Sequence, residues 1–440
     1  MNIFNKSLNR LQLNCKPNVF RFSSSLSYLE KTPITIKLWE KRKEHDKKTS
    51  KMPLLSKNSS KTPNDSRVDV LYNFNGEEGL KETYIDGFGN VLMGRLLEDL
   101  DALAGNVAFF HCDDGNPETP GVSLVTAAVE RMKFEASGIS VHKNLVLTGQ
   151  VVYKGSSSLD VLIEAHSTDC TDQENPEKID LLNPLKSDTR LLQSVFTYVA
   201  RDKSTGKAAK VIDLDMNNCT KYEKMFYKER ENEADYRKKI RKGEAVTDYL
   251  KTLDQRLRWL MLERGKSMQD MPALHTHNQV VLQQTTAIEN SFICEPQKSN
   301  TGGKVFGGFL INRAFMLAQA NAYLFSGKPA TLTMVDKITF RRPVEISDLI
   351  RLRSRITYCS KEDPYRMVVM VTCDVARPEN GISYQSNKFT FVFTSNDKEI
   401  GGEQIKTVLP LNRMEAESAF HGACNVLGLD PETIKEEYKN

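Results

Sequence analysis

The feature that most constrains the fold of this 440-residue chain is an internal repeat. The segment LDALAGNVAFF at 100–110 is similar to AFMLAQANAYLF at 314–325, with Leu103-Ala104 matching Leu317-Ala318. Each segment precedes runs of alternating apolar and polar residues around polar turns, a pattern typical of antiparallel strands. We therefore expect two copies of one unit, each with a short lead strand, one long apolar helix and four or five antiparallel strands.

A helix as apolar as these two must be covered on most of its sides. A sheet wrapped around the helix provides that cover, so the predicted fold class is α+β, with one such unit in each half. Because each sheet would have free edges, we expect the two units to pack side by side. The predicted division is a first unit at 66–212, a charged helical connector at 213–270, a second unit at 271–410 and a C-terminal tail at 411–440.

The beginning of the chain has a composition of its own. Residues 1–29 contain no acid, a cluster of serines, and four basic residues, which are Lys6, Arg10, Lys16 and Arg21. This composition is typical of a mitochondrial transit peptide, so we expect the chain to act in the mitochondrial matrix. Residues 30–65 are polar and rich in charge, and we expect them to form a flexible lead-in.

The overall composition excludes several classes of protein. The net charge of +4 is nearly neutral, and acids and bases are mixed in the connector, which argues against nucleic-acid binding. No run of 18 apolar residues is present, so we expect no membrane-spanning helix. The eight cysteines form no CxxC pair, which argues against a structural zinc site and a disulfide framework. We therefore predict neither a metal nor a cofactor.

One acid lies on the apolar face of the first predicted helix. Asp101 follows Leu97 by four residues and precedes Ala104 by three, so it points in the same direction as they do. Burying a carboxylate is costly unless it is paired or used. Two interpretations stay open: Asp101 reaches solvent or pairs with Arg95, or burial raises its pKa and makes it a general base. Its neighbours Glu98 and Asp99 fall on other faces and are predicted to be solvated.

Three segments of the sequence together resemble the mitochondrial acyl-coenzyme A thioesterases that carry two hotdog domains in one chain. They are GRLLEDLDALAG with a following HC, VFGGFLINRAF, and VDKITFRRPVEISDLI, and the resemblance covers roughly residues 70–410. It implies a double hotdog fold and hydrolysis of fatty acyl-CoA to free fatty acid and CoA. It also implies that Asp101, which matches the position of the catalytic carboxylate in hotdog thioesterases, assists the attack of water.

Hydrolysis of a thioester also requires a group that stabilises the oxyanion. The unpaired N–H groups at a helix N-terminus suit this task, and Gly307 and Gly308 would let a thioester carbonyl approach the backbone closely. A simple tight entrance to the helix is the alternative interpretation. The first helix has the bulkier pair Leu92-Met93 in the place of Phe306-Gly307, which puts an oxyanion site there in doubt.

The two halves are therefore complementary. Aligned on the repeat, Phe315 of the second helix stands opposite Asp101, and phenylalanine cannot accept a proton. The first half supplies the acid and the second half supplies the glycine-lined entrance. The resemblance places active sites at the interface between hotdog units, so we expect one competent site and one degenerate site that faces Phe315.

Two asparagines are candidates to orient water or substrate. Asn90 matches a position at which some two-domain relatives carry a catalytic asparagine. Asn300, ahead of the second helix, is the alternative amide, either in catalysis or in contact with CoA. The alternative for each is a helix cap, which is the commoner role of asparagine before a helix.

CoA carries several negative charges, and guanidinium groups suit phosphate. Arg341 and Arg342 directly follow the predicted strand KITF. Arg351, Arg353 and Arg355 alternate with apolar residues and so share one face of a strand. We predict that CoA contacts come from these arginines, with an ordinary solvated sheet face as the alternative for the last three.

The predicted function is hydrolysis of acyl-CoA by Asp-assisted attack of water where the two hotdog units meet. A hotdog lyase would need a histidine paired with an acid near a helix entrance, and neither entrance has one. The remaining alternative is a non-catalytic hotdog protein that binds acyl-CoA or serves as a structural subunit of a mitochondrial assembly. The predicted partners are acyl-CoA and further copies of the chain in a homo-oligomer.

Overall fold

The computed structural model describes residues 31–49, 60–114, 122–134, 138–172, 181–182, 188–203, 205–241, 248–275, 280–300, 302–360, 365–395, 406–429, 434 and 438. The predicted transit peptide at 1–29 lies outside these described residues.

Each half contains the predicted lead strand, long helix and antiparallel strands. The first half has β2 (Val68–Tyr72), α3 (Met93–Cys112), β3 (Val122–Val129), β4 (Met132–Phe134), β5 (Asn144–Lys154), β6 (Ser158–Thr168) and β7 (Arg190–Asp202). The second half has β10 (Ile288–Ile293), α6 (Gly307–Ser326), β11 (Thr331–Val335), β12 (Ile338–Thr339), β13 (Leu349–Cys359), β14 (Tyr365–Arg377) and β15 (Ile382–Ser395). This order confirms the double hotdog.

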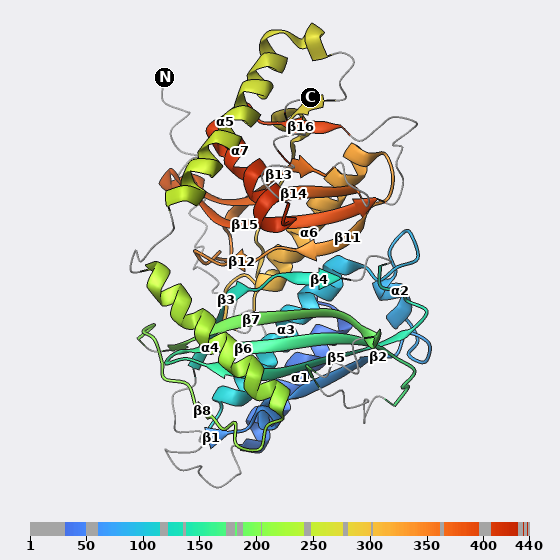
Figure 1. Ribbon diagram of the computed structural model, residues 1–440. Coiled ribbons are helices and arrows are strands. Elements are labelled where there is room, and N and C mark those ends of the chain that lie inside the picture. Colours follow the sequence, from blue (N-terminus) through green and yellow to red (C-terminus); the bar gives the residue numbers. More distant parts are fainter. Residues whose placement is uncertain are drawn as a thin grey trace, which may run out of the picture.

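The strands of both halves join into one sheet of twelve strands (Figure 1). Its main path runs β10-β13-β14-β15-β11-β4-β7-β6-β5-β2, so each half presents the strands after its helix to the other half. The halves are joined where β4 pairs with β11 and β3 pairs with β12, both antiparallel. The pairing satisfies backbone groups that would otherwise be exposed at two sheet edges.

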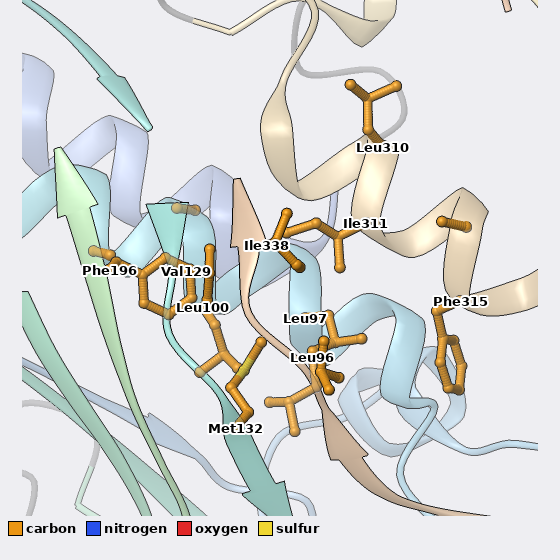
Figure 2. Packing of buried hydrophobic residues seen from close by; sticks show 14 of the residues in the cluster. Leu96, Leu97, Leu100, Val129, Met132, Phe196, Leu310, Ile311, Phe315 and Ile338 are labelled. Carbon is orange, nitrogen blue, oxygen red and sulfur yellow. The ribbon is translucent and has the colours of Figure 1, made fainter. Parts of the chain in front are cut away.

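The helices α3 and α6 lie inside the curved sheet and pack against each other. They have the same length, and Met93 and Gly307 begin them, so Leu97 and Ile311 occupy the same position in the repeat. Figure 2 shows Leu97, Ile311 and Ile338 of β12 gathered where the halves meet, and all three are buried in the main core. Each helix thereby buries an apolar face that its own sheet leaves uncovered.

A glycine of each helix lies against the other helix. A methyl group at Gly308 would lie 2.9 Å from both the Cα and the carbonyl oxygen of Glu98. The repeat-related Gly94 lies against Asn312, whose side-chain amide donates to Glu98 Oε2 at 3.1 Å. Since backbone atoms cannot move aside as a rotamer can, only glycine fits at Gly308.

The predicted flexible lead-in is wrong over its first part. Helix α1 (Pro33–Thr49) packs along α3, with Ile34, Leu38 and Trp39 buried. The Asn106 side chain of α3 also donates to the Leu38 carbonyl. The polar composition of the segment reflects one solvated face of a helix, while its few apolar residues join the main core.

The remaining elements lie outside the sheet or at its ends. In the predicted connector, α4 (Lys221–Arg241) lies on the outer face of the first half and α5 (Asp248–Asp270) lies beside α7 (Arg413–Phe420) of the predicted C-terminal tail (Figure 1). A π-helical turn (His421–Val426) follows α7. The shorter elements are α2 (Leu80–Tyr84), β1 (Ser60–Lys61) paired with β8 (Asp213–Leu214), and β9 (Val280–Leu282) paired with β16 (Thr407–Leu409).

Within the part of the chain that the structure describes, no helix combines the length and the apolar character that crossing a membrane requires.

The close helix crossing makes a prediction for Gly308. The change Gly308→Ala should lower the free energy of unfolding by about 1–3 kcal/mol, because the added methyl meets backbone of α3. Urea denaturation of the variant and the wild type measures this difference. Gly87→Ala is the matched control, since nothing lies within 4 Å of a methyl group there. If Gly308→Ala were as stable as Gly87→Ala, the crossing would not be as tight as described.

Candidate active site at the junction of the two halves

Asp101 is buried and fully engaged in hydrogen bonds. Its side chain is 2% exposed. Oδ1 accepts from the hydroxyls of Thr126 and Tyr198, both at 3.0 Å, and Oδ2 accepts from the backbone N–H of Gly308 at 2.7 Å. Burial raises the pKa of this carboxyl above its ordinary value, and the three hydrogen bonds offset part of that rise. The first of the two interpretations, in which Asp101 reaches solvent or pairs with Arg95, does not describe the observed environment.

The partners of Asp101 come from both halves of the chain. Thr126 on β3 and Tyr198 on β7 belong to the first half, whereas Gly308 belongs to the first turn of α6 in the second half. A methyl group at Gly307 would lie 2.9 Å from Asp101 Oδ2 and 3.6 Å from the ring of Phe340. The structure therefore brings the acid of the first unit to the glycine-lined helix entrance of the second unit.

The two glycines play different parts in this geometry. The Gly308 N–H donates to Asp101, so it is not free for a substrate. The N–H of Gly307, the first residue of α6, has no hydrogen-bond partner among the described residues, as is usual at a helix N-terminus. Phe340 stands beside this amide because β12 continues along β3, where the Phe340 N–H donates to the Ala127 carbonyl. An open amide, an aromatic wall and a buried carboxylate thus converge on one point.

The prediction that Glu98 and Asp99 are solvated is wrong. Glu98 is 4% exposed and Asp99 is fully buried. Asp99 accepts from Thr35 Oγ1 at 2.8 Å and Tyr72 OH at 2.9 Å, and also from the hydroxyls of Thr32 and Tyr84. Burial raises the pKa of both carboxyls. Helical periodicity predicted that these faces of α3 are exposed to solvent, but α1, α2 and α6 cover them.

The asparagines lie at different helix entrances. Asn300 precedes α6, and its Oδ1 accepts from the N–H groups of Gly302 and Lys304 at 2.8 and 3.1 Å, so it shapes the turn that leads to Gly307. Its Nδ2 has no partner in the part of the chain that the structure describes. Asn90 precedes α3 and lines a pocket with Phe315. The catalytic prediction for Asn90 is therefore not supported by its position, because the entrance of α3 faces Phe315 just as the entrance of α6 faces Asp101.

The degenerate site predicted from Phe315 is apolar. Phe315 is buried, and its ring packs edge-on against Phe391 at 5.9 Å and stacks on Phe393 at 6.1 Å between centroids. Phe391 belongs to β15, which repeats β7, the strand that carries Tyr198. The acid and its tyrosine in the first half are thus matched by two phenylalanines in the second half.

The predicted CoA-binding arginines fall into two groups. Arg341 and Arg342 are exposed and directly follow Phe340, and the Arg342 guanidinium lies 4.9 Å from the ring centre of Tyr384. Arg351 and Arg353 do share one face of β13, but they pair with Glu289 and Asp374 at 2.6 and 2.7 Å. Arg355 on the same face pairs with Glu415 at 3.3 Å. These arginines are therefore held in ion pairs with carboxylates of β10, β14 and α7, and none of them pairs with Asp101 in the part of the chain that the structure describes.

Sequence reasoning missed Thr126 and Tyr198. A signal for Tyr198 was present in the repeat, because FTY at 196–198 matches FTF at 389–391. The hydroxyl thus occurs in the half that has the acid. Thr126 had no comparable signal, since one hydroxyl in an alternating strand is common on a solvated face.

No protein-family model matches the chain. Among curated proteins, the mitochondrial acyl-coenzyme A thioesterase 4 of Humulus lupulus is 34% identical over 88% of this chain and 71% of its own length. The chloroplastic acyl-coenzyme A thioesterase 2 of the same plant is 35% identical over 88% of this chain and 86% of its own length. The mitochondrial acyl-coenzyme A thioesterase 9 of Homo sapiens is 26% identical over 85% of this chain and 80% of its own length.

Solved structures similar to this chain include acyl-CoA hydrolases. One from Staphylococcus aureus, in complex with butyryl-CoA and CoA, has a TM-score of 0.31 and 17% identity over 36% of this chain and 96% of its own. One from Agrobacterium tumefaciens has a TM-score of 0.23 and 15% identity over 75% of this chain and 94% of its own. On the extent of its identity with the two Humulus lupulus proteins, the chain belongs to the acyl-coenzyme A thioesterase family.

Proposed function

We propose that this chain hydrolyses fatty acyl-CoA to free fatty acid and CoA at the junction of its two hotdog units. The observation that carries the proposal is the 2.7 Å hydrogen bond from the Gly308 N–H to Asp101, which joins the acid of one unit to the helix entrance of the other. Membership of the thioesterase family supports the reaction class.

In the proposed mechanism Asp101 is the general base. It takes a proton from water, the water oxygen attacks the thioester carbonyl carbon, and the C–S bond then breaks. CoA leaves as a thiolate that recovers the proton from Asp101, and the acyl group leaves as the carboxylic acid. The raised pKa of Asp101 makes the carboxylate a stronger base than an exposed one. Thr126, Tyr198 and Gly308 hold it in one orientation.

The oxyanion of the tetrahedral intermediate needs donors that are already in place. We assign this task to the Gly307 N–H, which is open at the N-terminus of α6, where the helix dipole also favours negative charge. The absence of a side chain at Gly307 lets the thioester approach this amide. Asn300 is the candidate to orient the substrate or water, through its Nδ2. It belongs to the same helix entrance.

For the phosphates of CoA we favour Arg341 and Arg342. They follow Phe340, whose ring lies beside Gly307, and both side chains are exposed to an incoming ligand. Arg351 and Arg353 stay in the prediction as weaker candidates, because a phosphate would have to displace a carboxylate from each.

We further propose that the protein acts in the mitochondrial matrix and forms homo-oligomers of double hotdog chains. The composition of residues 1–29 and the mitochondrial names of several relatives support the location. The non-catalytic alternative, an acyl-CoA-binding or structural subunit, keeps the same fold and is separated from the enzyme by the first experiment below.

The change Asp101→Asn should lower kcat for acyl-CoA by on the order of 10²–10⁴. The asparagine oxygen can accept from Gly308, and its NH₂ can donate to the hydroxyls of Thr126 and Tyr198, so the site should stay assembled. Release of CoA thiol across acyl lengths measures the rate. In the wild type, kcat/KM should rise with pH through the raised pKa of Asp101.

Asp69→Asn is the matched control, because this carboxylate on β2 pairs with Arg67 away from the junction. It should keep the wild-type rate. Equal rates for Asp101→Asn and the wild type would remove Asp101 from the mechanism. No hydrolysis by the folded wild type at any acyl length would favour the non-catalytic alternative.

Stability should respond to Asp101→Asn in the opposite sense from activity. Because the pKa of Asp101 is higher in the folded chain than its ordinary value, the folded state binds more protons between those two values. The contribution of this group to stability is therefore largest at low pH and is lost as pH rises through the raised pKa. Asp101→Asn removes that loss, so the variant should gain stability relative to the wild type as pH rises above the ordinary pKa of an aspartate. Chemical denaturation at several pH values measures it, and a gap that widened at acid pH would contradict the assignment.

The arginine assignment makes a prediction about KM. The double change Arg341→Ala with Arg342→Ala should raise KM for acyl-CoA on the order of tenfold, because charged contacts to phosphate are lost, and should change kcat little. An acyl-pantetheine substrate, which lacks the nucleotide phosphates, should show no change in KM. Arg351→Ala is the control on the ion-paired face. A larger increase in KM for Arg351→Ala than for the double variant would place the CoA site on the arginine face of β13 instead.

A further inference from the structure

One glycine interrupts the burial of α3 beside the candidate site. From Leu96 to Ala108 every residue of this helix is buried except Gly105, which is partly exposed. Gly105 follows Asp101 by four residues, so it lies one helical turn, or about 6 Å, further along the same side of α3. The accessible part of this helix is therefore next to the candidate general base.

The packing of the core does not require a glycine at position 105. The three atoms nearest to a methyl group at Gly105 would all belong to the Tyr198 side chain, at 3.4–4.0 Å, which is ordinary van der Waals contact. Other glycines at these helices are truly confined. A methyl group would lie 2.9 Å from backbone atoms of Glu98 at Gly308, and 2.7 Å from Ile163 at Gly149. Gly105 is therefore not explained by contacts within the chain.

The backbone does not require this glycine either. Gly105 lies inside a helix and has no positive φ, so any residue could adopt its conformation. Glycine is less stable than alanine at such a position, because it loses more conformational freedom on folding. The repeat-related position of α6 has the long side chain of Gln319, so the hotdog helix can carry a side chain there. What remains is a ligand that needs the space beside Asp101.

The strand beside this part of α3 presents apolar side chains. Val122, Leu124 and Thr126 alternate along β3 and so share one face, and the Thr126 hydroxyl donates to Asp101. Val122 and Leu124 are only partly buried and pack against the main core. A chain that begins at Asp101 and follows this face would therefore meet hydrocarbon rather than polar groups.

A cation marks the far end of this apolar surface. Phe109 lies one turn beyond Gly105 on α3 and is partly exposed. The Arg42 guanidinium of α1 lies 3.7 Å from the centre of the Phe109 ring. Asp101 and Phe109 are eight residues apart, or about 12 Å along the helix. An apolar chain can extend over that length before it meets a charge, which suits an acyl chain of medium length.

The chemistry of this surface decides which arm of the substrate lies on it. The pantetheine arm carries two amides, which would lose their hydrogen bonds to water against Val122 and Leu124. An acyl chain has no polar group to desolvate and gains free energy by leaving water. The CoA arm has its candidate partners elsewhere, at Arg341 and Arg342 beyond the Phe340 ring.

We infer that Gly105 determines acyl-chain specificity: from the thioester at Asp101 and Gly307, the acyl chain runs along α3 over Gly105 towards Phe109. The inference rests on the proposed function for the identity of the ligand. The absence of a side chain at Gly105 admits any acyl chain long enough to pass one turn of α3. A side chain at this position would exclude such chains and leave short acyl groups unaffected.

The first test is the dependence of hydrolysis on acyl length. In the full chain, Gly105→Leu fills the space over the helix, so kcat/KM for decanoyl-CoA should fall on the order of tenfold or more. A butyryl group is too short to lie over Gly105, so kcat/KM for butyryl-CoA should stay unchanged. Ala320→Leu, a leucine added at an exposed position of α6, is the matched control and should keep both rates.

Gly105→Ala keeps the inference testable if the leucine variant does not fold. Its methyl group meets Tyr198 at an ordinary distance, and alanine favours a helix over glycine, so the melting temperature should be at or above that of the wild type. The value of kcat/KM for decanoyl-CoA should nevertheless fall several-fold, with that for butyryl-CoA unchanged. A lower melting temperature would show that packing requires the glycine and would overturn the inference.

Binding separates the acyl chain from the rest of the substrate. Calorimetry compares CoA with a decanoyl-CoA ketone analogue, in which a methylene separates the sulfur from the carbonyl so that it cannot be hydrolysed. Gly105→Leu should weaken binding of the analogue on the order of tenfold and leave binding of CoA unchanged. An equal loss for both ligands would assign the space to pantetheine and overturn the inference, as would no loss for either ligand.

The binding experiment also distinguishes failure of this inference from failure of the proposed function. A wild type that binds the analogue more tightly than CoA, through Gly105, but releases no thiol from decanoyl-CoA would refute the hydrolase and leave the acyl site in place. Hydrolysis by the wild type with the same dependence on acyl length in Gly105→Leu would support the hydrolase and refute the role of Gly105.

Discussion

The contact on which the rest of the structure depends is the crossing of α3 and α6 at Gly308. Without a side chain at Gly308 the two backbones approach closely enough for its N–H to reach Asp101. The same approach lets β3 and β12 run beside each other and join two sheets into one. The fold and the candidate site are therefore one arrangement: the helix packing that closes the core also places an N-terminus against a buried acid.

That arrangement buries three carboxyl groups within four residues of α3, those of Glu98, Asp99 and Asp101. Each has different hydrogen-bond partners, which indicates a different role for each. Asp99 is surrounded by hydroxyls and ties α1 to the helix, whereas Glu98 bonds Asn312 and lies near Lys31, a lysine whose pKa burial lowers to about 8. The same α1 reaches the candidate site, because Trp39 packs edge-on against Phe306, the residue that precedes Gly307. Of the three carboxyls, only Asp101 lies beside the open amide of Gly307, so α1 packs against the helix entrance without contributing a donor to Asp101.

Much of this could be predicted from the sequence, because the repeat compares the chain with itself. The alignment of Leu103 with Leu317 predicted the position of both helices, and it set Phe315 opposite Asp101. What it could not predict are the contacts that other segments make with each helix. Burial of Asp99 depends on hydroxyls from α1, α2 and β2, which helical periodicity cannot predict. The sequence could not choose between Asn90 and Asn300 for a related reason: the choice depends on which entrance faces which helix, and that is set by packing rather than by spacing.

The two halves differ in polarity at their helix entrances because buried polar groups require hydrogen-bond partners. A buried carboxylate needs donors and a buried hydroxyl needs an acceptor, and in the core of the first half Asp101 and Tyr198 meet part of this need for each other. The second half has Phe315 and Phe391 at these positions. Neither side chain carries a polar group, and their rings pack against each other. An acid placed at Phe315 alone would meet aromatic rings where Asp101 meets hydroxyls, and Met93 where Asp101 faces Gly307. Conversion of one kind of site into the other therefore requires at least three coupled changes, which explains why two entrances with the same backbone can differ so completely in chemistry.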